Sequence, residues 1–376
     1  MRLIIFLLIA AACGWPQTAG QPLPPWSPGT FDIHQIDTGR GNAALWVLPD
    51  GTTVLLDAGG VPDKPGLELG PRRPNADVST ADAIASYVRQ FGGRTPASLD
   101  YAIATHFHQD HMAALATVAT KVPVKKLIDR GPDPAAPTYE DHSAYFKWRS
   151  ATGGETIRVG AANQIVSQAK DFEVRNIAGN GLVWTGSAER TATRVPANWR
   201  QFPPTIQPTE NHFSLAFRIR YGKFDYFTGG DLPGVRLDGV PEWHDMETPV
   251  AQAVGAVDVT VLNHHGWLDT TNETFLDTLQ PRVVVIPAWH ATHPDHSVLR
   301  RLRSPQRKPA PPDLFITSLL EAPKVIFKYL RDPFKSTEGH VLIRVAPGGG
   351  KYQVIILDSQ QVRPTVKAVF GPYESK

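Results

Sequence analysis

The stretch Thr105-His106-Phe107-His108-Gln109-Asp110-His111 places three histidines and one aspartate within six positions. It follows an apolar segment, residues 99–104, for which the pattern predicts a β-strand. A turn after a strand can direct several side chains to one point, and neutral imidazoles and carboxylates are ligands that zinc-like metals prefer. A surface histidine cluster is the alternative. Because the stretch is internal, it is not an expression tag, and we interpret it as a metal-binding turn.

The four donors of this turn fit two metal ions better than one, because their side chains diverge along the backbone. We expect His106 and His108 to bind one ion, and Asp110 and His111 to bind the other. Each ion then needs further ligands from other parts of the chain, since zinc sites hold at least four ligands in all.

Three later segments offer such ligands. Asp231 follows the predicted strand 224–228 and two glycines, and it is placed to bridge two cations, unless it is an ordinary turn aspartate. His264 and His265 follow the strand 259–262; the alternative is packing, and because successive side chains point apart we expect only one to bind metal. His212 precedes the strand 213–217 and is a further candidate ligand.

Other histidines have weaker signals. His293, before Pro294 at the start of a predicted helix, is interpreted as a substrate contact, a support for a ligand or a helix cap. Four isolated histidines are expected to be structural or to face solvent: His34, His142, His244 and His340.

The rest of the chain predicts many short elements. Predicted strands cover residues 30–38, 43–48, 53–56, 157–159, 172–177, 213–221, 257–263, 283–287, 314–318, 340–345 and 352–357. Predicted helices cover residues 79–91, 112–119, 248–253, 271–279 and 295–302. Strands occur both in hairpins and in alternation with helices, which predicts an α/β layered domain with mixed sheets.

Composition excludes several classes of protein. The chain has 376 residues, of which 41% are hydrophobic and 20% charged, so it is not globally disordered. Lys and Arg number 38 against 36 Asp and Glu, a net charge of +2 that gives no strong signal for nucleic-acid binding. The single cysteine, Cys13, excludes an intramolecular disulfide.

The first 20 residues resemble a signal peptide. Arg2 is followed by an apolar run over residues 3–12, which is shorter than the ~20 residues that a membrane-spanning helix needs. We therefore expect residues 21–376 to be secreted or periplasmic, with no transmembrane segment, and Cys13 is a weak candidate for a lipid anchor.

Taken together, these motifs resemble the metallo-β-lactamase superfamily. Residues 106–111 match its HxHxDH motif, Asp57 matches its early aspartate and Asp231 its bridging aspartate. Within the superfamily, the sequence is most similar to the hydrolase domain of the competence protein ComEC. That similarity is carried by Gly39-Arg40-Gly41-Asn42-Ala43, Asn211-His212-Phe213-Ser214-Leu215, Phe227-Thr228-Gly229-Gly230-Asp231-Leu232, His264-His265-Gly266 and His293-Pro294.

The resemblance implies a four-layer αββα fold, in which two mixed sheets lie between helices. It implies one hydrolase domain over residues 21–376, with an insertion at about 123–208 that is long for such a domain. It also implies that Asp57 orients a ligand histidine, with Asn42 near it. Asn42 stands where the family has an aspartate, and an extra glycine precedes Asp231.

The implied function is hydrolysis by a metal-bound hydroxide between two divalent ions, Zn²⁺ or alternatively Mn²⁺. The ComEC-like relatives suggest a phosphodiester or small-molecule substrate, and Asp110 or His293 would move protons. Two alternatives remain: hydrolysis of carboxylic esters, lactones or amides at the same site, and a metal-containing binding protein without turnover. Aromatic and Arg side chains of the insertion line a substrate groove or form its core; they include Trp199, Arg149, Arg194 and Arg200.

Overall fold

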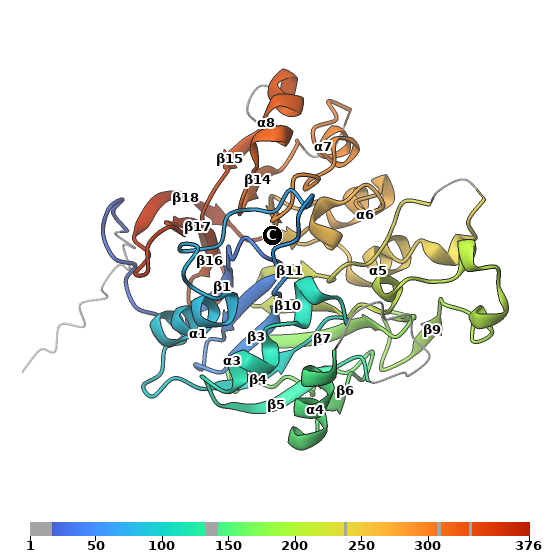
Figure 1. Cartoon of the computed structure of the whole chain (residues 1–376), viewed down its shortest axis with the longest axis horizontal. Helices are drawn as coiled ribbons and strands as arrows, with labels where there is room; N and C mark the ends of the chain where they lie inside the picture. Colours follow the sequence, from blue (N-terminus) through green and yellow to red (C-terminus); the bar gives the residue numbers. More distant parts are fainter. Residues whose placement is uncertain (1–16, 132–141, 237–238, 307–309, 331–332) are drawn as a thin grey trace, which may run out of the picture.

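The chain folds into two nine-stranded mixed sheets that pack face to face between outer helices (Figure 1). The computed structural model describes residues 17–131, 142–236, 239–306, 310–330 and 333–376. The apolar run at residues 3–12 and Cys13 lie outside the described residues, so the signal peptide and the lipid anchor stay predictions. Across the residues described, no helix has the length and apolar character needed to cross a membrane.

The first sheet has the strand order β18-β17-β16-β1-β2-β3-β4-β5-β6, in which β3 to β6 run parallel and the other neighbours antiparallel. Its strands are β1 (Phe31–Gln35), β2 (Ala43–Val47), β3 (Thr53–Ala58), β4 (Leu99–Ile103), β5 (Val124–Asp129), β6 (Glu155–Thr156), β16 (His340–Val345), β17 (Lys351–Leu357) and β18 (Val366–Glu374).

The second sheet has the order β15-β14-β13-β12-β11-β10-β7-β8-β9, and its strands from β11 to β15 run parallel. Its strands are β7 (Phe172–Gly179), β8 (Leu182–Trp184), β9 (Thr191–Thr193), β10 (Ala216–Tyr221), β11 (Phe224–Thr228), β12 (Val259–Val261), β13 (Val283–Ile286), β14 (Asp313–Ile316) and β15 (Phe334–Ser336). Residues 123–208 therefore supply strands to both sheets.

Helices cover the outer face of each sheet. The first sheet carries α1 (Thr80–Phe91), α2 (Gln109–Met112), α3 (Leu115–Ala119) and α4 (Ser143–Thr152). The second carries α5 (Glu247–Val254), α6 (Glu273–Leu279), α7 (His296–Leu302) and α8 (Glu321–Phe327). Short 3₁₀ turns are η1 (Trp199–Gln201), η2 (Pro204–Ile206), η3 (Glu210–Phe213), η4 (Glu242–His244), η5 (Asn263–Gly266) and η6 (Lys328–Leu330). The four layers are those predicted.

Burial on both faces explains why the strands read as continuous apolar runs rather than as alternating patterns. On β2, Trp46 points between the sheets and meets the rings of Phe217 and Tyr226 edge-on, at centroid distances of 6.0 and 6.2 Å. Its neighbours Leu45 and Val47 point the other way, into the layer beneath the helices. Side chains on both faces of the strand are buried, so a shift in register would move buried side chains on each face.

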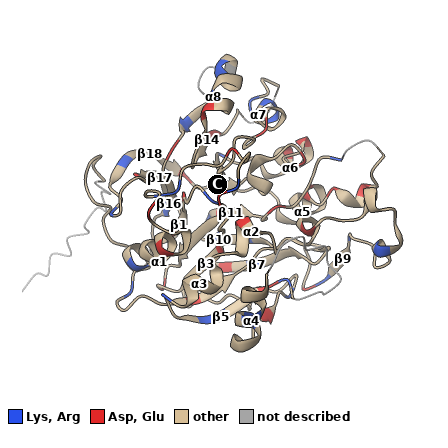
Figure 2. Cartoon of the chain, viewed as in Figure 1, with Lys and Arg blue, Asp and Glu red and all other residues tan. Residues whose placement is uncertain are grey.

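Several predicted elements differ in detail from the structure. The helix expected at 112–119 is divided into α2 and α3, with α2 beginning inside the histidine-rich turn at Gln109. Residues 157–159 are not a strand, and the expected strand start at Phe213 belongs to η3. Ser79 does cap α1 by accepting from Asp82 N, as its sequence pattern predicts. Charged side chains of both signs are interspersed over the chain (Figure 2).

Two isolated histidines are structural. His34 is 1% exposed, with Nδ1 3.0 Å from the Tyr87 hydroxyl, and His340 accepts a hydrogen bond from Asp37 N at Nδ1. Burial lowers the pKa of each ring to about 3. The folded protein therefore keeps both rings neutral over a range of pH in which an unfolded chain protonates them.

We expect this difference to make folding sensitive to acid. The pKa of His34 is lower in the folded state than its ordinary 6.5, so its contribution is present above that pH and is lost as pH falls towards 3. His34→Gln should therefore reduce the loss of unfolding free energy by about 1.4 kcal/mol per pH unit below about pH 6.5. Urea unfolding of both proteins across this range measures the difference, and parallel pH curves would contradict it.

Candidate metal centre

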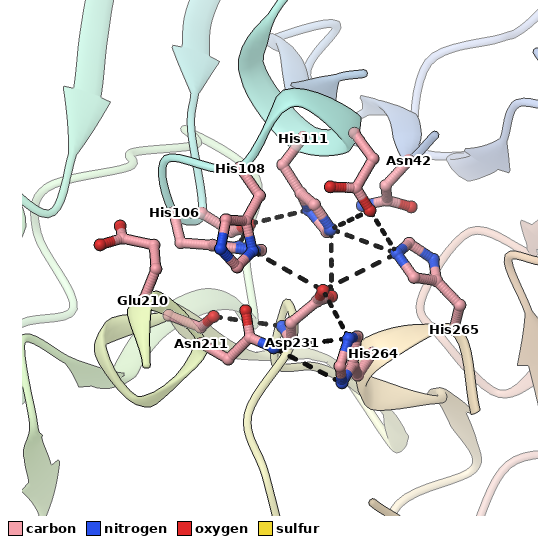
Figure 3. A network of polar contacts seen from close by, with 12 residues as sticks. Asn42, His106, His108, His111, Glu210, Asn211, Asp231, His264 and His265 are labelled. Atoms are coloured by element: carbon pink, nitrogen blue, oxygen red, sulfur yellow. Dashed lines mark hydrogen bonds and ion pairs between the residues drawn. The ribbon is translucent and has the colours of Figure 1, made fainter. Parts of the chain in front are cut away.

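The site lies where strands of both sheets end. The histidine-rich turn follows β4, Asp57 lies near the end of β3, Asp231 follows β11 and η5 follows β12. In each sheet these strands are parallel neighbours, so their carboxyl ends meet at one edge. Figure 3 shows the side chains of the two sheets converging on Asp231.

One group of donors consists of His106, His108 and Asp231, whose ligand atoms all lie within 4.8 Å of one another. His106 Nε2 is 3.1 Å from His108 Nδ1 and 3.7 Å from Asp231 Oδ2. His106 is fully buried, and burial lowers its pKa well below the usual range, which keeps the ring neutral and able to bind a cation.

A second group consists of Asp110, His111, Asp231 and His265, and its ligand atoms also lie within 4.8 Å of one another. Asp110 Oδ2 is 2.9 Å from His265 Nε2, and Asp231 Oδ1 is 3.1 Å from His111 Nε2. Burial opposes the charge on Asp231, but the nearby His111 and His265 hold the pKa of this carboxyl well below its usual range. Asp231 is thus a buried carboxylate shared by both groups.

Hydrogen bonds among these donors leave some of their atoms unsatisfied, and coordination of divalent ions would satisfy them. Two ring nitrogens, His111 Nε2 and His265 Nε2, face each other at 3.3 Å, although one proton at most can lie between them. Within the described residues, Asp231 Oδ1 has no hydrogen-bond partner, and its contact with His111 lacks hydrogen-bond geometry. Imidazole and carboxylate donors in this arrangement suit zinc and similar ions, and a shared carboxylate suits two ions side by side.

Comparison with known proteins agrees with this geometry. Residues 37–188 match the model of the Metallo-beta-lactamase superfamily, a segment that includes the whole histidine-rich turn. The matched segment is less than half of the chain, and the two sheets between helices form the αββα fold of that superfamily. The match and the two His and Asp groups agree on a metal centre at the histidine-rich turn. No curated protein sequence matches the chain.

Solved structures of low identity are similar to this chain over part of its length. CmlA, a diiron β-hydroxylase from Streptomyces venezuelae, is 14% identical, with a TM-score of 0.42 over 86% of this chain and 55% of its own. Igni18, a metallo hydrolase from Ignicoccus hospitalis, is 14% identical, with a TM-score of 0.35 over 68% and 81%. A putative Zn-dependent hydrolase from Thermotoga maritima is 10% identical, with a TM-score of 0.34 over 77% and 100%. This chain spans about half the length of CmlA.

Asp57 supports the histidine-rich turn through contacts with Thr105 and His111. Its Oδ2 lies 2.8 Å from His111 Nδ1, and Thr105 N and Oγ1 both donate to the same carboxylate. Asn42 donates to Asp57 Oδ2 at 2.8 Å. It therefore contacts Asp57, which in turn contacts the metal-group residue His111. Asp57 thus fixes which nitrogen of His111 faces the site, the part that the resemblance implied for it.

The structure distinguishes the two neighbouring histidines of η5. His265 belongs to the second group, and its Nδ1 contacts the Pro287 carbonyl, so Nε2 is left to face the metal position. His264 lies outside both groups: its Nδ1 is 2.8 Å from Asp269 Oδ1 and its Nε2 3.8 Å from Asp231 Oδ2. Both residues have left-handed backbones, with φ of 47° and 56°, which turns their side chains apart.

The prediction for His212 differs from the structure. His212 lies outside both groups, because its Nδ1 contacts Thr209 and its Nε2 contacts His244 Nδ1 at 3.0 Å. In the 3₁₀ turn η3, successive side chains point about 120° apart, so only one of two neighbours can face the site. Asn211 is the neighbour that faces it (Figure 3). In the sequence, Asn211 is recognised only as the first residue of the motif Asn211-His212-Phe213-Ser214-Leu215, not as a residue of the site.

His293 lies beside the second group without joining it. Its ring stacks on His265 at a centroid distance of 4.8 Å and is held edge-on by Trp289 at 5.2 Å. It is 5% exposed, and its Nδ1 has no hydrogen-bond partner among the described residues. Of the predicted roles, contact with substrate or support of a ligand fits this place, whereas the helix cap is supplied by Asp295.

Several aromatic and Arg side chains of the insertion, which are predicted to line a substrate groove or to form a core, have structural contacts. Trp199 is 6% exposed and contacts Phe213, Arg149 pairs with Asp129 at 2.6 Å, and Arg194 donates to backbone carbonyls. Arg200 differs from these residues, because it is exposed and lies over the Trp199 ring at 4.4 Å.

Gly59 sets how closely the backbone of the first sheet approaches the metal-binding turn. A Cβ at this position would overlap the carbonyl group of Asp110, which accepts a hydrogen bond from Asn42 N at 2.7 Å. Gly59→Ala should therefore displace Asp110 and lower metal affinity by about 10- to 100-fold. Calorimetric titration with Zn²⁺ measures this, with Gly350→Ala as a control, because a Cβ there meets open space and the backbone is not left-handed. Equal affinity in Gly59→Ala and wild type would contradict the assignment.

Proposed function

We propose that this protein is a secreted or periplasmic relative of the ComEC hydrolase domain that cleaves phosphodiester bonds with two divalent ions, Zn²⁺ or Mn²⁺. The shared carboxylate of Asp231 is the observation that carries the proposal, because it joins two donor groups into one centre. Adjacent cations suit in-line displacement at phosphorus, since one can face the attacking oxygen and the other the leaving oxygen. The apolar run at residues 3–12 supports export.

Different residues of the chain would bind the ions, orient the ligand histidines and move protons. When bound, the ions would supply an acidified water and stabilise negative charge on the reacting group. Asp57 and the Pro287 carbonyl hold the rings of His111 and His265 in the orientations that present Nε2. Asp110 Oδ2 lies 2.9 Å from His265 Nε2, and both atoms would bind the same ion. His293, clamped between aromatic rings, is placed to hold or move a proton at the edge of the centre.

A cavity beside η3 offers room for the rest of a substrate. It has a volume of about 500 Å³ and is lined by Arg130, Asn180, Thr193, Arg200 and Phe213, among others. Arg130 follows β5 and Phe213 ends η3, the turn that carries Asn211, while the residues of the two metal groups are not part of the lining. Its polar and aromatic lining suits a substrate larger than a bare phosphate.

A substrate comparison tests the proposal. Metal-free protein is incubated with a chromogenic phosphodiester, a panel of lactones and a panel of carboxylic esters, with and without Zn²⁺ or Mn²⁺. We expect metal-dependent turnover that is fastest on the phosphodiester. Faster turnover of lactones or esters would replace the proposal with its alternative. Absence of turnover at full metal occupancy would overturn hydrolysis and favour a binding protein.

A further inference from the structure

The two donor groups differ in the number of ionisable ligands. The group around His265 contains four such residues, whereas the group of His106, His108 and Asp231 contains three. Ions such as zinc and manganese take at least four ligands, so the smaller group has a coordination position that no His, Cys, Asp or Glu of the described residues fills.

Asn211 faces this position. Its side chain is 6% exposed, and within the described residues its Oδ1 is buried without a hydrogen-bond partner. The Nδ2 atom lies 3.4 and 3.5 Å from the ring nitrogens of His264, which leaves the oxygen on the other side of the amide. Figure 3 shows the amide oxygen of Asn211 turned towards His106 and His108. A buried carbonyl oxygen without a donor requires an explanation, and a cation provides one.

The position of Asn211 is built into the fold. Its neighbour Glu210 accepts from Arg130 and from Phe107 N at 2.9 Å, which ties η3 to the histidine-rich turn. At the other end of η3, Ser214 Oγ accepts from Asp231 N at 3.2 Å. Both segments that supply the three known donors are therefore joined to η3, and Asn211 is held between them.

We propose that Asn211 Oδ1 is the fourth protein ligand of the ion bound by His106, His108 and Asp231, an inference that rests on the two-ion centre of the proposed function. Amide oxygens are established ligands for hard cations. With Asn211 this group has two imidazoles, one carboxylate and one neutral amide, and hence one negative charge fewer than the group around His265. The two ions therefore bind in sequence, the group around His265 first.

Metal titration of the full chain tests the assignment independently of any substrate. Metal-free protein is titrated with Zn²⁺ by calorimetry and with Mn²⁺ by electron paramagnetic resonance. The wild type should bind two ions, the first more tightly. Asn211→Ala should lower the affinity of the second ion by about 10- to 100-fold and leave that of the first within about twofold. Asn211→Asp keeps an oxygen in place and adds a negative charge. Its affinity for the second ion should equal or exceed that of the wild type.

The neighbouring residue provides the matched control. His212→Ala removes a ring that lies outside both groups, so both ions should bind as in the wild type. Circular dichroism and thermal unfolding show that each variant is folded. Wild-type binding of both ions by Asn211→Ala would overturn the assignment while leaving the two-ion centre intact. Binding of fewer than two ions by the wild type would overturn the two-ion centre itself.

Discussion

Replacement of Asp231 by asparagine is expected to abolish binding of both ions and to lower kcat/KM by at least about 10³-fold, because loss of a single stabilising group already costs 10²- to 10³-fold in other enzymes. Asp231 is the one residue common to the two groups, and its oxygens face His106 on one side and His111 on the other. The asparagine keeps the shape of the side chain but removes the charge that both ions share.

Metal content and steady-state kinetics measure the effect together. Asp225→Asn is the matched control, because Asp225 lies near the start of β11, the strand that Asp231 follows, and pairs with Arg218. We expect this control to bind two ions and to retain its kcat/KM. If Asp231→Asn still binds two ions and turns over substrate at the wild-type rate, the shared-carboxylate centre is wrong.

The second large effect concerns stability. Glu210 is 1% exposed and forms a two-pronged ion pair with the buried Arg130, with N–O distances of 2.6 and 2.7 Å. The guanidinium also lies between the rings of Phe107 and Phe213, at 4.4 and 5.3 Å. Glu210→Ala leaves a buried cation without its counter-ion, and we expect the free energy of unfolding to fall by about 3–5 kcal/mol.

Urea unfolding of metal-free protein measures this loss without a contribution from bound ions. A double variant, Arg130→Met with Glu210→Leu, should recover a large part of the loss, because it removes both charges from the interior together. Recovery will be incomplete, since Phe107 N loses its acceptor in either case. A loss below about 1 kcal/mol in Glu210→Ala would show that the pair is not buried as described.

The difference between local and tertiary information is clearest at the metal centre. The HxHxDH turn, Asp231 and the pair His264-His265 could be found because strand ends are readable as apolar runs followed by glycine and histidine. The orientation of neighbouring side chains could not be read in the same way. The choice between His212 and Asn211 depends on a 3₁₀ turn, and the choice between His264 and His265 on two left-handed residues.

The sequence by itself determined the α/β layers, most of the strands and the residue types of the centre, because burial and metal chemistry leave local patterns. Tertiary structure alone decided which side chains meet. Asp231 meets the donors of the histidine-rich turn, which lie 120 or more residues earlier in the chain, and Glu210 meets Arg130 at a separation of 80 residues. Such contacts depend on the packing of two sheets against each other, and no short-range pattern in the chain records that geometry.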